Sequence, residues 1–208
     1  MLTPLAPGEL AAIVTSLEMR DRQRTRPLPA SPLRLVAWDA PTPEKHRALF
    51  RRVGAPWLWF SRLLLADDDL TRIIHDPAVR IWAVVDRAGI EVGLLELDFR
   101  APPDCEIAYF GLVPELTGQG HGRWLMAQAL MLAWRAPIAG ETSPALPVAR
   151  VWVHTCTLDH PAALGFYRQQ GFVPFARAIE IFADPRLIGI LPPTAAPQIP
   201  VLPRDPAS

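Results

Sequence analysis

Three glycines, Gly118, Gly120 and Gly122, alternate with other residues between a strand-like and a helix-like segment. The preceding residues, 105–113, are rich in strand formers, and apolar side chains follow the glycines at helical spacing. A glycine-rich turn of this kind leaves backbone N–H groups free at a helix N-terminus, where they can bind phosphate. The turn therefore indicates a phosphate-bearing ligand, although glycines also occur in such turns for purely structural reasons.

Two common phosphate-binding motifs do not fit this turn. A P-loop places Lys-Ser or Lys-Thr after its last glycine, whereas Gly122 is followed by Arg123 and Trp124. The dinucleotide fingerprint spaces its glycines as G-x-G-x-x-G, and here the spacing is G-x-G-x-G. The turn therefore belongs to neither motif.

Glu106 could act as a general base. It lies at the start of the strand-like segment 105–113. With a period of two, it would share a sheet face with the apolar side chains of Ala108, Phe110 and Leu112. Such a setting raises the pKa of a carboxyl toward neutrality, which suits a base. The alternative is a strand-end carboxylate that pairs with an arginine.

His154 and Tyr167 are the other candidates for proton transfer. His154 lies within the strand-like segment 150–156 and could serve as the base or contact a substrate. Its alternative is a neutral core histidine that is hydrogen-bonded to a neighbour. Tyr167 lies in a helix-like segment, and its phenol could donate a proton without itself being charged. Its alternative is an aromatic packing residue.

The elements that must position these residues alternate between strands and helices. Apolar patterning predicts strands over 33–38, 80–86, 90–99, 105–113, 150–156 and 172–182. It predicts helices over 43–53, 56–65, 67–75, 120–135 and 160–171. This order predicts an α/β fold with a sheet of mixed strand directions.

Prolines gather at both ends of the chain and suggest its domain limits. Residues 1–32 are expected to form an N-terminal arm with a short helix over 9–20. Residues 33–190 form the predicted domain. The proline-rich tail 191–208 can form neither a helix nor an inner strand, so we expect an extended arm, either disordered or lying on a surface.

The composition argues against several classes of partner. With 21 basic and 21 acidic side chains, the formal net charge is zero, so no nucleic-acid partner is expected. No apolar run approaches the roughly 18 residues of a membrane span, and no signal peptide is evident. Two cysteines fit a reducing compartment, so we expect a cytoplasmic protein, and we predict no metal site.

Two motifs together resemble the GNAT superfamily of N-acetyltransferases, over roughly residues 33–190. Residues 105–126 are similar to its acyl-CoA-binding motif, an apolar strand followed by Q/R-x-x-G-x-G/A at the start of a helix. Thr117 stands where the family has Gln or Arg. The second signature, A-x-x-x-Y-x-x-x-G-F, is carried by Ala163, Tyr167, Gly171 and Phe172. The stretches AYFGLVPE and WVHTCTLDHP further resemble an uncharacterised bacterial branch.

The resemblance implies a mixed central sheet flanked by helices, in which the parallel strands at 105–113 and 150–156 splay apart. The pantetheine arm of acetyl-CoA would enter the gap and pair with the backbone of Leu112 and Val113. His160 stands where many relatives carry a CoA-contacting Asn. The resemblance implies that the pyrophosphate binds at Gly118, Gln119, Gly120, His121, Gly122 and Arg123.

The resemblance also implies acetyl transfer to a primary amine by direct attack within a ternary complex. Glu106 lies fourteen residues before Gly120, the spacing of the basic glutamate in histone-type members. Tyr167 matches the tyrosine that protonates the departing CoA thiolate. The acceptor groove of relatives corresponds here to residues that include Trp57, Trp59, Tyr109 and His154.

A different class of function remains open, in which the chain is a non-catalytic acyl-CoA-binding module or a regulatory protein. Both a small amine and a peptide amine are open as the acceptor. A homodimer is open as the oligomeric state. Cys105 and Cys156 fall at opposite ends of their strands with no motif around them. We therefore expect neither a disulfide nor a cysteine nucleophile.

Overall fold

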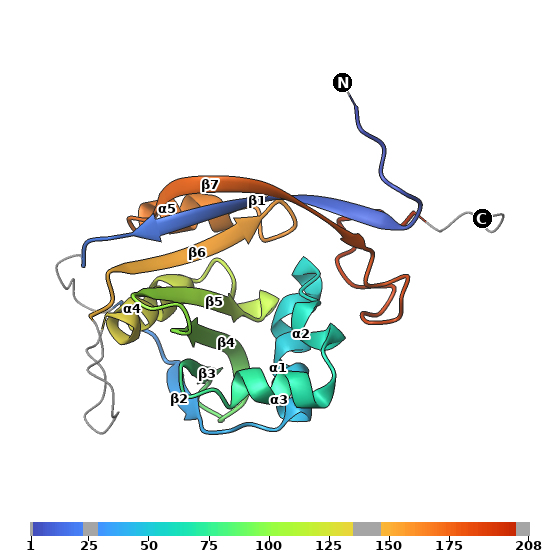
Figure 1. Ribbon diagram of the computed structural model, residues 1–208. Helices are drawn as coiled ribbons and strands as arrows, with labels where there is room; N and C mark the ends of the chain where they lie inside the picture. Colours follow the sequence, from blue (N-terminus) through green and yellow to red (C-terminus); the bar gives the residue numbers. More distant parts are fainter. Residues whose placement is uncertain (1, 23–28, 135–146, 203–208) are drawn as a thin grey trace.

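A computed structural model describes residues 2–22, 29–134 and 147–202, and it contains a seven-stranded sheet in the order β2-β3-β4-β5-β6-β1-β7 (Figure 1). The strands are β1 (Glu9–Met19), β2 (Arg34–Trp38), β3 (Val79–Val85), β4 (Glu91–Asp98), β5 (Asp104–Leu112), β6 (Arg150–Cys156) and β7 (Val173–Ala183). The sheet confirms the predicted α/β class and all six predicted strands.

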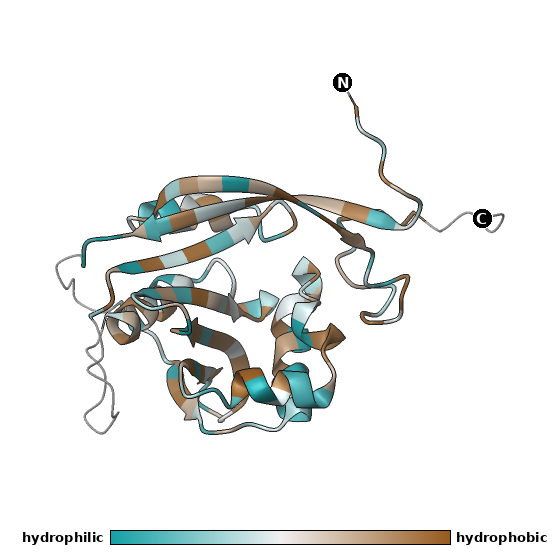
Figure 2. Cartoon of the chain, in the orientation of Figure 1, coloured by the Kyte–Doolittle hydropathy of each residue, from teal (hydrophilic) through white to brown (hydrophobic). Residues whose placement is uncertain are grey.

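Helices connect the strands where the patterning predicts them, but the predicted helix over 56–65 forms only as two short pieces, because Leu58 between them has a left-handed φ of +54°. They are α1 (Pro43–Gly54), η1 (Ala55–Trp57), α2 (Ser61–Leu64), α3 (Asp67–Ile74), η2 (Pro114–Leu116), α4 (His121–Ala133) and α5 (Ala163–Gln169). Thr42 caps α1 by accepting a hydrogen bond from the Lys45 backbone N–H at 3.3 Å. Figure 2 shows α1 and α3 with hydrophilic residues outward and β4 almost continuously hydrophobic. β4 is therefore an inner strand, buried on both faces.

The expected helix over residues 9–20 is wrong, because Glu9–Met19 form β1, between β6 and β7. β1 is antiparallel to both neighbours, and its side chains at Thr15, Leu17 and Met19 are buried at every second position. This alternation is the signature of a strand, and the run Ile-Val-Thr at 13–15 is β-branched. Residues 9–19 thus belong to the sheet, not to an arm outside it.

β5 and β6 are the parallel pair in this sheet, and they separate after a short contact. They pair at three positions, Asp104 with Arg150, Cys105 with Val151 and Glu106 with Trp152. Beyond these positions β6 pairs with β1 as far as Cys156, while β5 pairs with β4 as far as Leu112. The predicted splay of the two parallel strands is confirmed, and it leaves one backbone edge of β5 open (Figure 1).

A β-bulge in β5 corrects the predicted surroundings of Glu106. Glu96 of β4 pairs with Tyr109, but the next residue, Leu97, pairs with Ile107, so Ala108 is extra. The extra residue shifts the alternation of side chains between the two faces. Glu106 therefore shares its face with Tyr109 and not with the apolar side chains at 108, 110 and 112.

A buried ionic cluster lies between β4 and the helices. Glu96 has no exposed surface, and its two carboxylate oxygens face Arg62 and His46, with His46 Nε2 at 3.2 Å. Burial alone would raise the pKa of Glu96, but the hydrogen bond from His46 and the charge of Arg62 outweigh it, so this pKa is lowered. The cluster therefore links α1, through His46, and α2, through Arg62, to strand β4 of the sheet.

We expect Glu96→Gln to destabilise the fold by about 3 kcal/mol, because Arg62 then stays buried without a counter-ion. Glu91 is the matched control, since it lies on the same strand but is partly exposed and pairs with Lys45 at 3.4 Å. Glu91→Gln should cost less than about 1 kcal/mol. Urea unfolding at pH 7 measures both, and equal effects would contradict the assigned role of the cluster.

The described part of the C-terminal segment folds back onto the protein. The buried Arg186 pairs with Asp184 at 2.7 Å and donates hydrogen bonds from Nη1 to the carbonyl oxygens of Ala195, Ala196 and Ile199. Residues 191–202 contain no helix or strand. Leu191, Ala195 and Ala196 are nevertheless buried in the core. Residues 203–208 of the predicted tail, and residues 1 and 23–28 of the predicted N-terminal arm, lie outside the described residues.

Candidate active site

A cleft of about 960 Å³ opens where β5 and β6 separate. Its walls come from η1 and the residues after it, from β5, from the turn before α4, from α5, and from β6 and β7. Most of the residues predicted from the sequence to form a site line it. These are Trp57, Trp59, Tyr109, Leu112, Gly118, Gly120, Gly122, Arg123, His154, His160 and Tyr167.

One end of the cleft is the glycine-rich turn. Gly118 and Gly120 have φ angles of +79° and +85°, a left-handed conformation that favours glycine. A Cβ at Gly118 would meet nothing within 4 Å, so the space beside this backbone is free for a ligand. Arg123 lines the same end from the first turn of α4. Backbone amides, a helix N-terminus and one guanidinium together form a site suited to an anion.

Three predicted cofactor residues do not line the cleft. Val113 is buried, and its backbone N–H donates to the carbonyl oxygen of Val92. Gln119 donates a hydrogen bond to the carbonyl oxygen of Glu115 at 2.6 Å. His121 Nδ1 lies 3.1 Å from Ser31 Oγ. Their side chains therefore support the turn and its surroundings.

Tyr167 lines the cleft from α5. It is 7% exposed and packs edge-on against the rings of Phe110, Phe166 and Phe172. Burial, together with the charge of Asp159, raises the pKa of the Tyr167 phenol well above its ordinary value. The hydroxyl is therefore protonated at neutral pH and can donate a hydrogen bond or a proton into the cleft.

His154 and Glu106 form a pair across the two parallel strands. His154 Nδ1 lies 3.3 Å from Glu106 Oε1, and 47% of the His154 side chain is exposed, compared with 24% for Glu106. The imidazole lines the cleft, whereas Glu106 does not. The hydrogen bond to Glu106 raises the pKa of His154 above 6.5, against the lowering effect of burial. The two residues that the sequence offered as rival bases thus lie in contact.

Aromatic side chains from η1, the residues after it and β5 line part of the cleft. Trp59 Nε1 donates to Asp159 Oδ1 at 3.4 Å, and its ring packs 5.4 Å from that of Tyr109. Tyr109 Oη lies 2.6 Å from Ser61 Oγ. Trp57 packs edge-on against His160, with ring centroids 5.1 Å apart. The wall is mainly apolar, with the Ser61 and Tyr109 hydroxyls as polar groups.

The sequence analysis missed Glu180 and Phe182 of β7, which also line the cleft. Phe182 stacks on Phe60 with ring centroids 4.6 Å apart. The alternation along β7 places Glu180 and Phe182 on one face of the sheet. This alternation could have predicted that the two side chains lie on the same side of the sheet. It could not show that β1 would separate β7 from β6, because the predicted helix at 9–20 concealed that strand.

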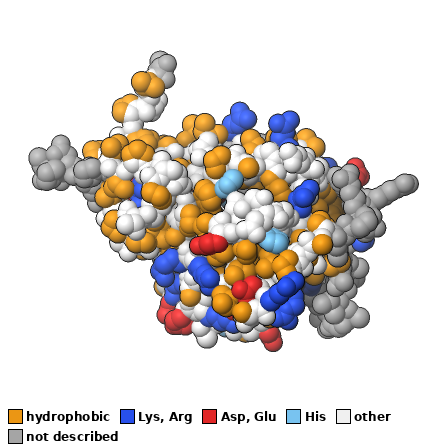
Figure 3. Space-filling model, turned by 180° about the vertical axis from the view of Figure 1, so that it is seen from behind, with side chains coloured by type: hydrophobic (Ala, Val, Ile, Leu, Met, Phe, Trp, Pro, Cys, Tyr) orange, Lys and Arg blue, Asp and Glu red, His pale blue; other side chains and the backbone are white. Residues whose placement is uncertain are grey.

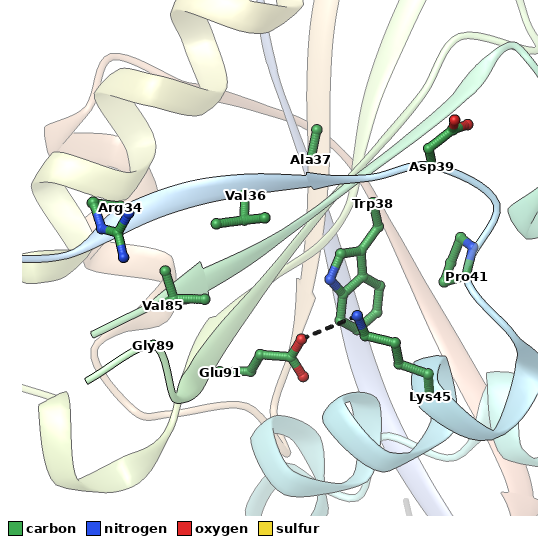
Figure 4. Close-up of a pocket in the computed structure, with 10 residues that line it drawn as sticks. All are labelled: Arg34, Val36, Ala37, Trp38, Asp39, Pro41, Lys45, Val85, Gly89 and Glu91. Atoms are coloured by element: carbon green, nitrogen blue, oxygen red, sulfur yellow. Dashed lines mark ion pairs between the residues drawn. The ribbon is translucent and has the colours of Figure 1, made fainter. Parts of the chain in front are cut away.

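A second, smaller hollow of about 380 Å³ lies along the edge strand β2 (Figure 4). Lys45 Nζ lies 3.4 Å from Glu91 Oε1 and 4.5 Å from the centre of the Trp38 ring. Lys45 and Glu91 are thus already paired, and none of the residues predicted for a site lines the hollow.

Figure 3 shows charged side chains of both signs, with hydrophobic ones between them, on the face seen from behind. Within the described residues, no group of three or more His, Cys, Asp or Glu side chains could hold a metal ion. None of the helices in the described part of the chain combines the length and apolar character that crossing a bilayer requires.

The fold is shared with solved GNAT structures. A GCN5-related N-acetyltransferase from Sphaerobacter thermophilus is 17% identical with a TM-score of 0.57, covering 85% of this chain and 52% of that one. One from Kribbella flavida is 17% identical with a TM-score of 0.50, covering 88% and 63%. A spermidine N-acetyltransferase SpeG chimera from Vibrio cholerae and hSSAT is 22% identical with a TM-score of 0.51, covering 70% and 83%. The chain thus spans little more than half the length of the Sphaerobacter protein.

At these identities the likeness is one of fold. No curated protein matches the chain in sequence. The family model described as an acetyltransferase (GNAT) domain matches residues 77–174, which contain β3 to β6, the glycine-rich turn and α5. This match covers 98 of the 208 residues, and the chain shares the fold of the solved GNAT structures.

Proposed function

We propose that this chain transfers an acetyl group from acetyl-CoA to a primary amine by direct attack. The observation that carries the proposal is one cleft lined by an anion-binding turn, by an imidazole that is paired with a carboxylate, and by a protonated tyrosine. A phosphate-bearing acyl donor fits the turn, and an amine that must lose a proton fits the pair.

Acetyl-CoA supplies the thioester, and several residues fit it. The backbone at Gly118 is open to the pyrophosphate, and Arg123, whose guanidinium lies beside Gly120, adds a positive charge. The open edge of β5 near Leu112 offers backbone groups to the pantetheine arm in the manner of an added strand. His160 lines the same cleft. This cradle uses backbone amides, which explains how a chain of zero net charge can hold a polyanion.

His154 is the proposed base, and Glu106 positions it. With Nδ1–H donating to the Glu106 carboxylate, Nε2 keeps a lone pair for the amine proton. His154 first accepts one proton from the substrate ammonium, which frees the lone pair of the amine. As the C–N bond forms and the C–S bond breaks, the Tyr167 hydroxyl donates a proton to the leaving sulfur, and the second proton lost from nitrogen passes to solvent, from which Tyr167 is reprotonated. Burial raises the pKa of the Cys156 thiol in the same cleft, so it is a poor nucleophile, which favours direct attack.

We expect the pKa of His154 to lie above 6.5 and to fall in Glu106→Gln, because the variant loses the carboxylate that stabilises the imidazolium. NMR titration of the His154 ring measures both values. The neutral imidazole is the base, so the His154 contribution to the acid limb of the rate profile should move to lower pH in the variant. An unchanged His154 pKa in Glu106→Gln would contradict the assigned pair.

We expect Arg123→Ala to weaken CoA binding about tenfold, because a charge-assisted contact to phosphate is lost. The loss should shrink as salt rises. Arg52 is the matched control, since it is exposed on α1 and does not line the cleft. Isothermal titration calorimetry with CoA measures both variants. If both variants bind CoA with equal affinity, the phosphates of CoA do not bind at Arg123.

The proposed function is tested by CoA thiol release from acetyl-CoA with and without amines. Small alkyl- and arylalkylamines, a polyamine and a lysine peptide form the panel. Amine-dependent release supports a transferase. If the protein binds CoA but no amine causes release of the CoA thiol, the transferase function is overturned and a non-catalytic acyl-CoA-binding module is favoured.

A further inference from the structure

The cleft is lined by few Lys, Arg, Asp and Glu side chains, and they carry charges of both signs. Arg123, at the glycine-rich turn, is the one Lys or Arg among the described residues that line it. The lining carboxylates are Asp159 and Glu180. Asp159 is engaged within the protein, because it accepts hydrogen bonds from Thr155 Oγ1 at 2.7 Å and from the Cys156 backbone N–H at 2.9 Å. Glu180 is therefore the lining carboxylate that is left to attract a cation.

Glu180 is exposed on β7, and within the described residues no hydrogen bond or ion pair holds its carboxylate. It shares a sheet face with His154, because Ala12 of β1 pairs with Glu180 and Ser16 of β1 pairs with His154, an even number of residues apart. Its charge contributes to the raised pKa of His154. Glu106 and Glu180 therefore both stabilise the protonated form of the proposed base, Glu106 by direct contact and Glu180 through its charge.

Aromatic rings line the cleft in which Glu180 lies. Phe182, two residues further along β7, stacks on Phe60 with an interplanar angle of 30°. Trp57 and Tyr109 complete the wall. Flat apolar surfaces of this kind favour an aromatic or alkyl body by stacking and by removing its surface from water.

We propose that the acceptor is a primary monoamine on a flat apolar body, an arylalkylamine, with its ammonium group drawn to Glu180 and its ring against Phe60 and Phe182. This inference rests on the proposed function and names the substrate class of the same cleft. A polyamine would need further free carboxylates spaced along the wall. The described lining residues offer Glu180 alone, since Asp159 is already hydrogen-bonded.

The test uses phenethylamine, n-hexylamine and spermidine as acceptors at a fixed acetyl-CoA concentration. We expect kcat/KM to fall in that order, with phenethylamine about 3- to 10-fold above hexylamine, as one aromatic contact would provide. Glu180→Gln should raise the KM for phenethylamine about tenfold with little change in kcat. Phe182→Ala should reduce the preference for phenethylamine over hexylamine.

Two control variants match these changes. Glu44→Gln removes an exposed carboxylate from α1, and Ile179→Ala truncates a side chain on β7 that is 71% exposed. Neither residue lines the cleft, so both variants should keep the KM of the unaltered protein. Preference for spermidine, or an unchanged KM in Glu180→Gln, would overturn the inference while leaving acetyl transfer intact.

A binding measurement separates this inference from the proposed function. Phenethylamine is titrated calorimetrically into protein saturated with CoA, and the titration is repeated with Glu180→Gln. If phenethylamine binds and Glu180→Gln weakens this binding, the assigned acceptor pocket is supported. If binding of this kind is seen but no amine is acetylated, only the proposed function is overturned. Absence of phenethylamine binding would overturn the assigned pocket.

Discussion

Tyr167→Phe should lower kcat by about 100-fold or more while leaving CoA affinity unchanged. General acid catalysis contributes about 10²- to 10⁴-fold, and the variant removes only the hydroxyl that would protonate the leaving sulfur. The ring still packs against Phe110, Phe166 and Phe172, so the fold should keep its stability. Steady-state kinetics with acetyl-CoA and the best amine of the panel measure the loss.

Replacing acetyl-CoA with another thioester donor provides a second test of the role of Tyr167. A donor with a more acidic leaving thiol needs less protonation, so the deficit of Tyr167→Phe should shrink with a thioester of lower thiol pKa. The raised pKa of Tyr167 also predicts that this residue does not limit the rate on the alkaline side below pH 10, because the phenol stays protonated there. Unchanged kcat in Tyr167→Phe would contradict the acid role.

The second large effect is expected for His154→Ala, which should lower kcat/KM by about 100- to 1,000-fold at pH 7. An alkylammonium has a pKa near 10.4, so at neutral pH a base must remove its proton before attack. The loss of kcat/KM in His154→Ala should therefore become smaller as the pH approaches 10, where the free amine becomes abundant. A pH–rate profile of the variant beside the unaltered protein measures both effects.

His75 provides the matched control for His154. It is an exposed histidine at the end of α3, where its Nε2 lies 3.0 Å from the Pro41 carbonyl oxygen. His75→Ala should keep the rate and the pH profile. Added imidazole should partly restore His154→Ala if the missing group is a base. A deficit that stays constant from pH 7 to 10 would instead indicate a structural role.

The sequence predicted most of the fold because its local signals agree with the final structure. α1 carries Pro43 at its start and Thr42 as cap, and the strands from β3 to β7 show apolar patterning of the right length. β1 was missed because its residues 9–19 also suit an amphipathic helix. Only the pairing with β6 and β7, which are more than 130 residues away, decides between the two.

The cleft could be predicted in outline but not in its contacts. The glycine-rich turn and Tyr167 lie in recognisable motifs, and the structure places both in one cleft. The contact between His154 and Glu106 depends on the register of β5 against β6, and the face of Glu106 depends on the bulge at Ala108. An extra residue in one strand leaves no reliable trace in the sequence, so the apolar face predicted for Glu106 was wrong.

The central claim is that this cleft moves an acetyl group from a thioester to an amine. The most direct measurement is mass spectrometry of the amine after incubation with acetyl-CoA, beside quantification of the free CoA thiol. The account predicts an amine heavier by one acetyl group and CoA released in equal amount, with both lost in the double variant His154→Ala and Tyr167→Phe. An unmodified amine under these conditions, with acetyl-CoA bound and intact, would contradict it.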